Sequence, residues 1–246
     1  MASITAIILT RNEKDFIEDC IRSIQKITER IVVVDSFSED NTVELAKNMG
    51  AEVYQHEFFN YSKQYKYAVE IANVKTKWIL RIDADERLTS ESAVELEQLC
   101  NDNENTNVTG IVLRFYNMFL AKPMYHGGMY PWKKLSVYKT GIGDIEDRNM
   151  DEHIILSSGT VIETKKDSKH LAYRGLTFFT NKSNWYSTRE AMDYFEQKKV
   201  SKKNANFKTR IKMNIYYKLP LGLRSWLYYA YRYYCLLYTS PSPRDS

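Results

Sequence analysis

The residues best suited to chemistry are two aspartates, Asp83 and Asp85, which follow the apolar stretch 78–82. In an extended chain every second side chain points the same way, so both carboxylates would project together from the end of a strand. Open α/β sheets bind ligands at that edge. Oxygen ligands without sulfur suit Mg²⁺ or Mn²⁺, which proteins often share with substrate phosphates. An Asp-Xaa-Asp triplet also occurs in ordinary acidic turns, so the neighbouring elements must decide its meaning.

The elements around this triplet alternate between strands and helices. Short apolar, partly β-branched runs predict buried strands at 3–10, 30–35, 52–55 and 78–82. Apolar side chains at helical spacing predict helices from about residue 16 to 27, from 40 to 49, from 62 to 72, and after Ser90, which can cap the last of them. Strands and helices that alternate with short connections indicate parallel βαβ units and an α/β fold.

The first glycine of the chain is Gly50. A glycine-rich phosphate loop after the first strand is therefore excluded, and a bound nucleotide would need another device. One candidate is Asp35, at the end of the second predicted strand, and another is a metal at Asp83 and Asp85. Asp35 can accept hydrogen bonds from a base or a ribose, or it can serve as a capping or turn acid in the segment 35–40. Both interpretations stay open at this point.

Three segments resemble the family 2 glycosyltransferases in order and spacing. They are Thr10-Arg-Asn-Glu13, Ile31-Val-Val-Val-Asp-Ser36 with Asp40-Asn-Thr42, and Asp83-Ala-Asp-Glu86. The later segment His126-Gly-Gly-Met-Tyr-Pro131 is similar to the subgroup related to bacterial lipopolysaccharide-core and capsule glycosyltransferases. The resemblance covers about residues 3 to 235. It implies a GT-A fold, with a mixed and mostly parallel sheet flanked by helices, a nucleotide-sugar donor, a divalent metal and inversion at the anomeric carbon.

The resemblance also implies roles for individual residues. Carried over by position, Thr10, Arg11, Glu13, Asp35 and Asp83 would bind the nucleotide. A divalent metal, Mg²⁺ or Mn²⁺, would be held by Asp85, Asp83 and His170, although His170 can also be read as a hydrogen-bonded histidine at a strand edge. Such an ion neutralises the negative charge that develops on a departing diphosphate. A UDP-sugar is the preferred donor because UDP is frequent in the family.

Inversion by direct displacement also requires a base that takes the proton of the acceptor hydroxyl. The segment from Asp144 to His153 is rich in acids, which indicates either a solvated acidic loop or the site of this base. In family relatives a carboxylate follows the preceding strand, and many members of the subgroup carry a His-Glu pair there. This chain has Asp151-Glu152 followed by His153, so Glu152 is predicted as the catalytic base and Asp151 as the second candidate.

A segment rich in glycine, proline and aromatic residues, 122–132, separates a predicted strand at 108–115 from another at 135–139. It can be an irregular connection or a wall against which a sugar stacks. The resemblance favours a substrate pocket, with six predicted members: Arg114, His126, Gly127, Gly128, Tyr130 and Trp132.

The end of the chain differs from the rest in composition. Residues 196–235 hold ten Lys or Arg and one acid, and eight tyrosines lie between 216 and 238. This pattern predicts an amphipathic interfacial helix on an anionic membrane surface; packing onto the catalytic domain or oligomerisation is the alternative. No nucleic-acid motif accompanies it, so nucleic acid is not expected as a partner. The expected organisation is a GT-A catalytic domain at 1–195, a basic aromatic extension at 196–238 and a non-native tail at 239–246.

Composition is that of a globular protein, with 43% hydrophobic and 27% charged residues among 246. Cys20 and Cys100 fall on apolar helix faces and Cys235 has no paired spacing, which indicates a reducing compartment. The start of the chain has no signal-peptide pattern. We therefore expect a cytoplasmic enzyme, peripheral on the inner face of the plasma membrane, with a glycan or lipid-linked acceptor. The alternatives are an inactive nucleotide-sugar-binding relative and a nucleotidyltransferase, although the glycine-rich loop typical of the latter is missing.

Overall fold

The structure, a computed structural model, describes residues 2–119, 122–126, 130–146, 153–171, 175–197 and 219–231. Within its helices, the side chains of residues 189–197, 221 and 228 are outside this description. Four predicted site residues lie outside the described residues: Gly127, Gly128, Asp151 and Glu152. The segments 198–218 and 232–246 lie outside them as well. The chain divides into two compact units, one of residues 1–123 and 131–179 and one of residues 124–130 and 180–246.

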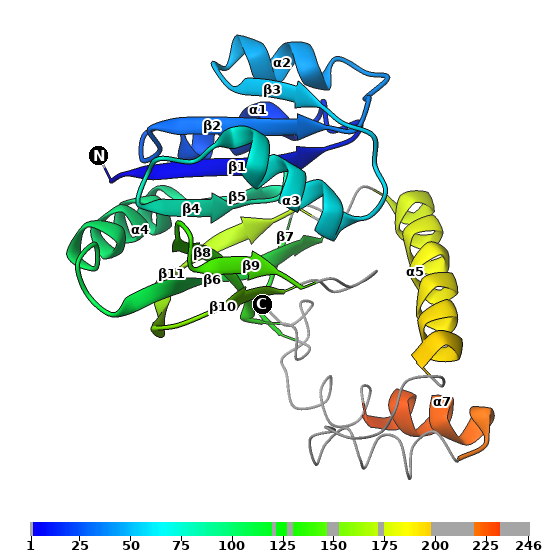
Figure 1. Ribbon diagram of the computed structural model, residues 1–246. Coiled ribbons are helices and arrows are strands. Elements are labelled where there is room, and N and C mark those ends of the chain that lie inside the picture. The colour runs from blue at the N-terminus through cyan, green and yellow to red at the C-terminus, as the bar shows by residue number, and fades with distance from the viewer. Residues whose placement is uncertain are drawn as a thin grey trace. The chain divides into compact units, whose positions relative to one another are not determined.

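A nine-stranded sheet is the framework of the first unit, with the strands in the order β3-β2-β1-β4-β8-β6-β11-β5 and with β7 paired to β6 (Figure 1). Parallel pairs join β3 to β2, β2 to β1 and β1 to β4. Strand β8 is antiparallel to both β4 and β6, and β11 is parallel to β6. Strands β1 to β4, β6 and β11 thus point the same way, which confirms the predicted mixed and mostly parallel sheet flanked by helices.

The strands of this sheet have the following bounds: β1 Ile4–Thr10, β2 Arg30–Asp35, β3 Glu52–Gln55, β4 Trp78–Arg81, β5 Glu86–Arg87, β6 Val108–Phe119, β7 Lys122–Met124, β8 Trp132–Lys139 and β11 Thr160–His170. A separate hairpin consists of β9, Gly143–Ile145, and β10, Ile154–Leu156. The helices have these bounds: α1 Ile17–Ile24, α2 Thr42–Asn48, α3 Tyr61–Ala72, α4 Ser90–Asp102, α5 Leu176–Gln197 and α7 Leu221–Ala230.

Alternating side chains of the strands fill two apolar clusters, one on each face of the sheet. Ile8 and Val33 belong to one cluster, which α1, α2 and α4 cover, whereas Ile7 and Val32 belong to the other, which α3 covers. Helix α1 shows why its sequence folds in this way, because its buried residues recur at the spacing of one helix face: Ile17, Cys20, Ile21 and Ile24. Both faces are covered near β1, so β1 and β2 can be almost continuously apolar.

Two local predictions are corrected. Strand β4 ends at Arg81, and the next residues turn, because the backbone N–H of Glu86 donates to the carbonyl of Asp83 at 2.9 Å. Asp83 and Asp85 are therefore not on one extended strand, and their side chains reach different neighbours. The cap of α4 is Thr89 rather than Ser90, since Thr89 and Ser92 form a reciprocal capping box.

The second unit contains α7 and most of α5. Several large apolar side chains of α7 are more than a third exposed, namely Leu223, Trp226, Leu227 and Tyr229. Among the helices that the structure describes, none combines the length and the apolarity needed to cross a bilayer.

Candidate functional site

The candidate site lies at the edge of the sheet formed by the carboxyl ends of its parallel strands. Thr10 and Asp35 end β1 and β2, and the acidic turn 83–86 follows β4. His170 ends β11, and the antiparallel strand β8 begins at this edge with Trp132. The short strand β5 pairs with β11 in the register that sets Glu86 opposite His170. Ligands of open α/β sheets bind at this edge, as expected from the sequence.

A carboxylate and an imidazole face each other at the centre of this edge. Oδ2 of Asp85 lies 3.8 Å from Nε2 of His170, and the two side chains are 14% and 19% exposed. The backbone holds the pair in place, since the N–H of Leu171 donates to the carbonyl of Asp85 at 2.8 Å. The ring of Trp132 stacks on the imidazole, with 4.7 Å between ring centroids. The sequence predictions for Asp85 and His170 therefore fall on neighbouring side chains.

The second nitrogen of His170 fixes the orientation of its ring. Nδ1 lies 2.7 Å from Oδ1 of Asn117, and this amide oxygen can only accept a hydrogen bond. In the tautomer that carries the proton on Nδ1, the ring donates to this oxygen and Nε2 is left as an acceptor that can bind a metal ion. A metal-binding histidine is usually oriented in this way, by a hydrogen bond from the ring nitrogen that does not bind the metal.

One carboxylate and one imidazole fit a divalent ion that is shared with other donors. In the part of the chain that the structure describes, no three His, Cys, Asp or Glu side chains gather closely enough to hold a metal by themselves. An ion at Asp85 and His170 would take its remaining ligands from water and from phosphate oxygens, as Mg²⁺ and Mn²⁺ often do. An imidazole ligand favours Mn²⁺ over Mg²⁺.

The carboxylate of Asp83 is held by a buried lysine that the sequence analysis did not identify. Nζ of Lys134 lies 2.7 Å from Oδ2 of Asp83 and 2.8 Å from Oε1 of Glu86. The side chain of Glu86 is fully buried, that of Lys134 is 13% exposed and that of Asp83 is 45% exposed. Oε2 of Glu86 also accepts the backbone N–H of Asp83, at 2.9 Å. One glutamate thus holds both the backbone of Asp83 and the ammonium group beside it.

These contacts shift the pKa values of the three groups. Burial raises the pKa of Glu86, and nearby Asp83 adds to the rise, while Lys134 opposes it. Burial lowers the pKa of Lys134, but the attraction of Asp83 and Glu86 outweighs burial, so the net shift is upward and the ammonium stays charged. Partial burial raises the pKa of Asp83, whereas Lys134 and Arg81 lower it by more, so Asp83 stays ionised.

A buried arginine ties the acidic turn to helix α1. Nη1 of Arg87 donates to the carbonyls of Ala84 and Glu86, at 2.6 and 2.8 Å. Nη2 of Arg87 donates to the carbonyl of Phe16, just before α1, at 2.5 Å. Arg87 is 6% exposed, so these contacts are shielded from water. Arg87 therefore connects the turn that carries Asp83 and Asp85 to the residue that precedes α1.

The loops after β1 and β2 are joined by reciprocal hydrogen bonds. The N–H of Asn12 donates to Oγ of Ser38, and the N–H of Glu39 donates to Oδ1 of Asn12, both at 2.8 Å. The N–H of Glu13 donates to Oγ1 of Thr42, also at 2.8 Å. The side chain of Arg11 is exposed beside these contacts. Arg11 and Glu13 thus lie in two connected loops, and the buried residues Thr10 and Asp35 lie at the bases of these loops.

Asp35 itself is fully buried. Its Oδ1 accepts Oγ1–H of Thr10 at 2.9 Å, and its Oδ2 accepts the backbone N–H of Ser38 at 2.8 Å. This is the arrangement of a turn acid, one of the two interpretations left open by the sequence. The next residue continues the network, because Nε2 of Gln64 donates to Oγ of Ser36 at 3.1 Å. Asp35 therefore shapes the loop that follows β2.

The described residues of the predicted pocket are divided between the two units. Nε of Arg114 donates to Oδ1 of Asp167 at 3.0 Å, and alternation along β6 sets Arg114 on the face opposite Asn117. His126 is exposed, and the ring of Tyr130 lies against Tyr125, within the second unit. Trp132 is the member that contacts the Asp85–His170 pair, through its stack on His170.

The two predicted bases, Asp151 and Glu152, come between β9 and β10 in the sequence and are outside the described residues. Ile145 pairs with Ile154, and the N–H of Glu146 donates to the carbonyl of His153 at 3.0 Å. In Figure 1 the arrow of β9 points in the same direction as that of β4. The hairpin therefore leads toward the edge of the sheet that carries the acidic turn.

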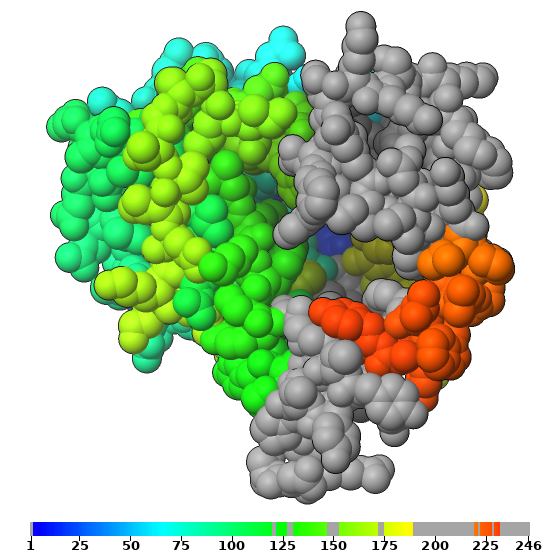
Figure 2. All heavy atoms as spheres, turned by 90° about the horizontal axis from the view of Figure 1, so that it is seen from below, coloured from blue at the N-terminus to red at the C-terminus, as the bar shows by residue number. Residues whose placement is uncertain are grey.

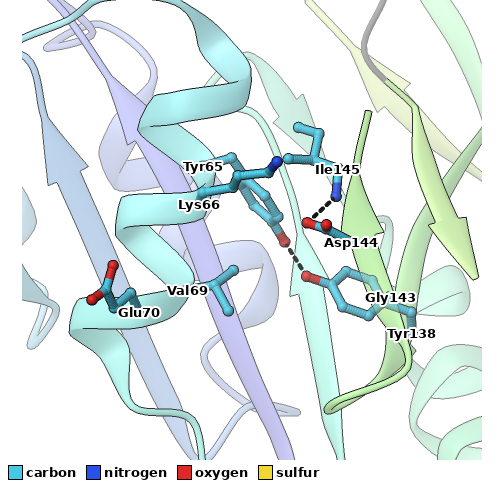
Figure 3. A pocket seen from close by; sticks show the side chains of 8 residues that line it. All are labelled: Tyr65, Lys66, Val69, Glu70, Tyr138, Gly143, Asp144 and Ile145. Atoms are coloured by element: carbon cyan, nitrogen blue, oxygen red, sulfur yellow. Dashed lines mark hydrogen bonds between the residues drawn. The ribbon is translucent and has the colours of Figure 1, made fainter. Parts of the chain in front are cut away.

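A small pocket separates α3 from β8 and β9 (Figure 3). Its volume is about 190 Å³, below the range of about 300–1,000 Å³ in which small-molecule sites usually fall. The hydroxyl groups of Tyr65 and Tyr138 meet at its inner wall, 2.8 Å apart, and Asp144 lies at its rim. None of the predicted site residues lines it, so it is separate from the site predicted from the sequence.

Sequence reasoning missed Lys134 and Asn117 as members of the site. The predicted strand began at Leu135, whereas β8 begins at Trp132, so Lys134 was left between a loop and a strand. Asn117 lies beyond the predicted end of its strand at Phe115, because β6 continues to Phe119. Neither position carries a period-2 signal, because Lys134 follows another lysine and Asn117 stands between Tyr116 and Met118.

Comparison with known protein families identifies the chain. Residues 5–151, more than half of the chain, match the family described as glycosyl transferase family 2. The chain belongs to glycosyl transferase family 2. The resemblance seen in the sequence is confirmed at the level of the family, and the sheet described above is the GT-A type of fold expected for it.

Individual relatives are distant. An uncharacterized glycosyltransferase of Rickettsia prowazekii is 27% identical over 221 residues, which is 87% of this chain and 74% of the relative. The glucosyl-3-phosphoglycerate synthase of Mycobacterium tuberculosis, solved with Mn²⁺ and UDP, matches with a TM-score of 0.38 and 18% identity, over 48% of this chain and 44% of the other. A mannosyltransferase of Pyrobaculum calidifontis, solved with GDP-mannose and Mn²⁺, gives a TM-score of 0.49 and 13% identity, over 70% and 57%. The matched parts are about half of each solved chain.

Proposed function

We propose that this family 2 chain is an inverting, metal-dependent glycosyltransferase that uses a nucleotide-sugar donor, with a UDP-sugar preferred. The observation that carries the proposal is the Asp85–His170 pair, set beside Asp83 at the edge where the parallel strands end. Asp85 and His170 would bind the ion, and Asp83 would face the nucleotide. The ion, when bound, would neutralise the charge that develops on the diphosphate.

In the proposed reaction an acceptor hydroxyl oxygen attacks the anomeric carbon of the donor sugar. The new carbon–oxygen bond forms as the bond between that carbon and the diphosphate oxygen breaks, and its electron pair leaves with the diphosphate. The hydroxyl proton passes to a carboxylate, for which we propose Glu152 first and Asp151 second. The direction of β9 supports this choice, because β9 runs the same way as β4, which the acidic turn follows.

The nucleotide would lie on the surface formed by the loops after β1 and β2. Thr10 and Asp35 are buried below this surface and hold its shape, whereas Arg11 is exposed and can contact a phosphate or the base. An arginine suits phosphate because its planar fork can donate two hydrogen bonds at once. Glu13 belongs to the same surface, and its backbone N–H holds it there by donating to Oγ1 of Thr42.

We further propose a glycan or lipid-linked acceptor in the synthesis of lipopolysaccharide or another cell-surface polysaccharide, met at the cytoplasmic face of the plasma membrane. The segment 196–238 would form a basic, aromatic extension of a catalytic domain at 1–195. Exposed side chains on α7 and just after it support a membrane contact: Leu223, Trp226, Leu227, Tyr229 and Tyr231 are 41% to 61% exposed. Figure 2 shows α7 in orange. Each Lys or Arg near an anionic surface adds about 1 kcal/mol of attraction, which salt screens.

Liposome co-sedimentation tests the membrane contact. Binding should require anionic lipid, weaken in high salt and disappear when the chain is cut before Lys208. Trp226→Ser with Leu227→Ser should reduce binding, whereas Val94→Ser, which removes an equally exposed apolar side chain from α4, should not. Equal recovery of the intact chain in the supernatant with and without anionic liposomes would contradict the membrane contact and leave the transferase proposal standing.

A panel of nucleotide-sugars with Mn²⁺ tests the transferase activity. Release of free nucleoside diphosphate in the presence of a glycan acceptor is the expected result. Release of pyrophosphate would instead indicate a nucleotidyltransferase, and binding without turnover would indicate an inactive relative. Donor affinity measured by calorimetry in EDTA tests the metal separately, because an affinity that EDTA leaves unchanged would rule out the proposed ion.

A further inference from the structure

The acidic turn and its proposed ligand both carry negative charge. Three carboxylates, those of Asp83, Asp85 and Glu86, lie within four consecutive residues, and a nucleoside diphosphate is itself an anion. Like charges at such short range repel, and the repulsion is strongest where water is excluded. The ammonium group of Lys134, 13% exposed, contacts two of these carboxylates directly and so offsets part of their charge.

We propose that Lys134 is a positioning residue that sets the orientation of the Asp83 carboxylate for the nucleoside diphosphate, with Glu86 as its anchor. This inference rests on the proposed function, in which Asp83 contacts the nucleotide.

The contacts of Glu86 explain why it can act as an anchor. Its side chain is fully buried, so its carboxylate has no alternative partner in water. Oε2 accepts the backbone N–H of Asp83 at 2.9 Å, and Oε1 accepts the ammonium of Lys134 at 2.8 Å. The carboxylate of Glu86 therefore holds the backbone of Asp83 through Oε2 and the ammonium group of Lys134 through Oε1.

Lys134 then controls the remaining freedom of Asp83. Its ammonium donates to Oδ2 of Asp83 at 2.7 Å, which fixes the rotation of the carboxylate. Because the side chain of Asp83 is 45% exposed, the other oxygen can face a ligand at the edge of the sheet. A carboxylate that is already oriented loses less rotational freedom when the ligand binds. The arrangement thus prepares one oxygen of Asp83 for the nucleotide and reserves the other for Lys134.

The first experiment measures the affinity for UDP and for GDP by calorimetry in the presence of Mn²⁺. Lys134→Met keeps the length of the side chain and removes the charge, and it should weaken nucleoside diphosphate binding at least tenfold, or about 1.4 kcal/mol. The matched control is Lys133→Met. Lys133 precedes Lys134 on β8, is 48% exposed and pairs with Glu163, so its replacement should leave the affinity unchanged. Circular dichroism would confirm that both variants fold.

A double variant separates positioning from simple neutralisation of Glu86. Lys134→Met combined with Glu86→Gln removes the unpaired buried charge, while the new amide oxygen can still accept the N–H of Asp83. If Lys134 orients Asp83, the affinity stays low although the stability recovers. If the affinity returns to that of the unaltered protein, Lys134 serves only to neutralise Glu86 and the proposal is overturned.

A double-mutant cycle tests whether Lys134 acts through Asp83. Lys134→Met combined with Asp83→Asn should bind no more weakly than Asp83→Asn alone, since the oriented carboxylate is already lost. Losses that simply add would show that Lys134 acts on the ligand independently, and would overturn the proposal. If the unaltered protein binds neither UDP nor GDP, both the proposed function and this inference are contradicted. If the unaltered protein binds them and Lys134→Met binds them equally well, only this inference is contradicted.

Discussion

Nε2 of His170 lies 3.8 Å from Oδ2 of Asp85, although the two residues are distant in the sequence. The antiparallel pairing of β5 with β11 brings them together, because its register sets His170 opposite Glu86, the neighbour of Asp85. Asn117 on β6 holds the far side of the imidazole. Strands β5, β6 and β11 thus position the side chains of Asp85 and His170. The contacts within this arrangement can be tested.

Asn117→Ala should weaken Mn²⁺ binding without removing a metal ligand. The change leaves His170 free to rotate, and loss of such an orienting partner typically lowers metal affinity about 10- to 100-fold. The affinity for Mn²⁺ can be measured by electron paramagnetic resonance at a saturating concentration of UDP. Asn101→Ala, on the exposed surface of α4, is the control. Equal affinities in the two variants would show that Asn117 does not orient the ligand.

Mn²⁺ should bind weakly unless a nucleoside diphosphate is present. Asp85 and His170 supply two ligands, and the remaining ones must come from water and from phosphate. Titration of Mn²⁺ into the protein alone and into the protein with UDP checks this dependence. His170→Ala should remove the difference between the two titrations. Tight binding of Mn²⁺ to the protein alone would point to ligands other than this pair.

Glu152→Gln should lower kcat about 10²- to 10⁴-fold and leave donor affinity nearly unchanged, because the amide cannot take the proton of the acceptor hydroxyl. Initial rates at saturating donor, together with calorimetric donor affinity, separate the two effects. Asp151→Asn should have a much smaller effect on kcat. The reverse pattern would move the role of base to Asp151.

Gly143→Ala should destabilise the protein by about 1–3 kcal/mol, the usual cost of adding an atom to a closely packed site. A Cβ at this position would meet Cδ2 of Tyr138 at 2.3 Å, and Tyr138 is buried and cannot move aside. Chemical denaturation measures the change. Gly222→Ala, in α7, is the control, because a Cβ there meets nothing within 4 Å. A Gly143→Ala protein as stable as the parent would show that the hairpin can shift away from Tyr138.

The stability of the protein should fall between pH 8 and pH 9.5. Burial raises the pKa of Cys20 far above its usual value and that of Cys100 to about 12, so both thiols stay neutral in the folded chain. In the unfolded chain they ionise above their ordinary pKa of about 8.5, which favours unfolding by about 1 kcal/mol per thiol by pH 9.5. Denaturation at several pH values measures this loss, and Cys100→Ala should reduce it. In a Cys235→Ser background, iodoacetamide should modify the two thiols only after denaturation.

Much of the first half of the fold could be predicted from the sequence because its signals are local. Strands β2 and β3 have the predicted bounds, since buried β-branched runs leave little choice of structure. The geometry of Asp83 and Asp85 was predicted wrongly for a local reason as well. The alternation of an extended strand does not apply there, because a hydrogen bond from Glu86 to Asp83 closes a turn.

The partners of the acidic turn could not be predicted, because they depend on strand order. Lys134 reaches Asp83 only because β8 lies beside β4, and His170 reaches Asp85 only because β11 pairs with β5. Two strand pairings that are distant in the sequence must therefore be known before either contact can be inferred. The roles proposed for the individual residues, and the division into a domain at 1–195 and an extension at 196–238, stay predictions.

The insertion of β8 between β4 and β6 has a consequence for how the protein is made. The strands β1 to β4 emerge from the ribosome first and can already pair with one another, so the loops proposed to hold the nucleotide can form early. Lys134 arrives with β8 and His170 only with β11, so the acidic turn gains first its counter-charge and then its imidazole as the chain is made. The proposed activity would therefore require the complete sheet, because an incomplete chain lacks side chains of the proposed site.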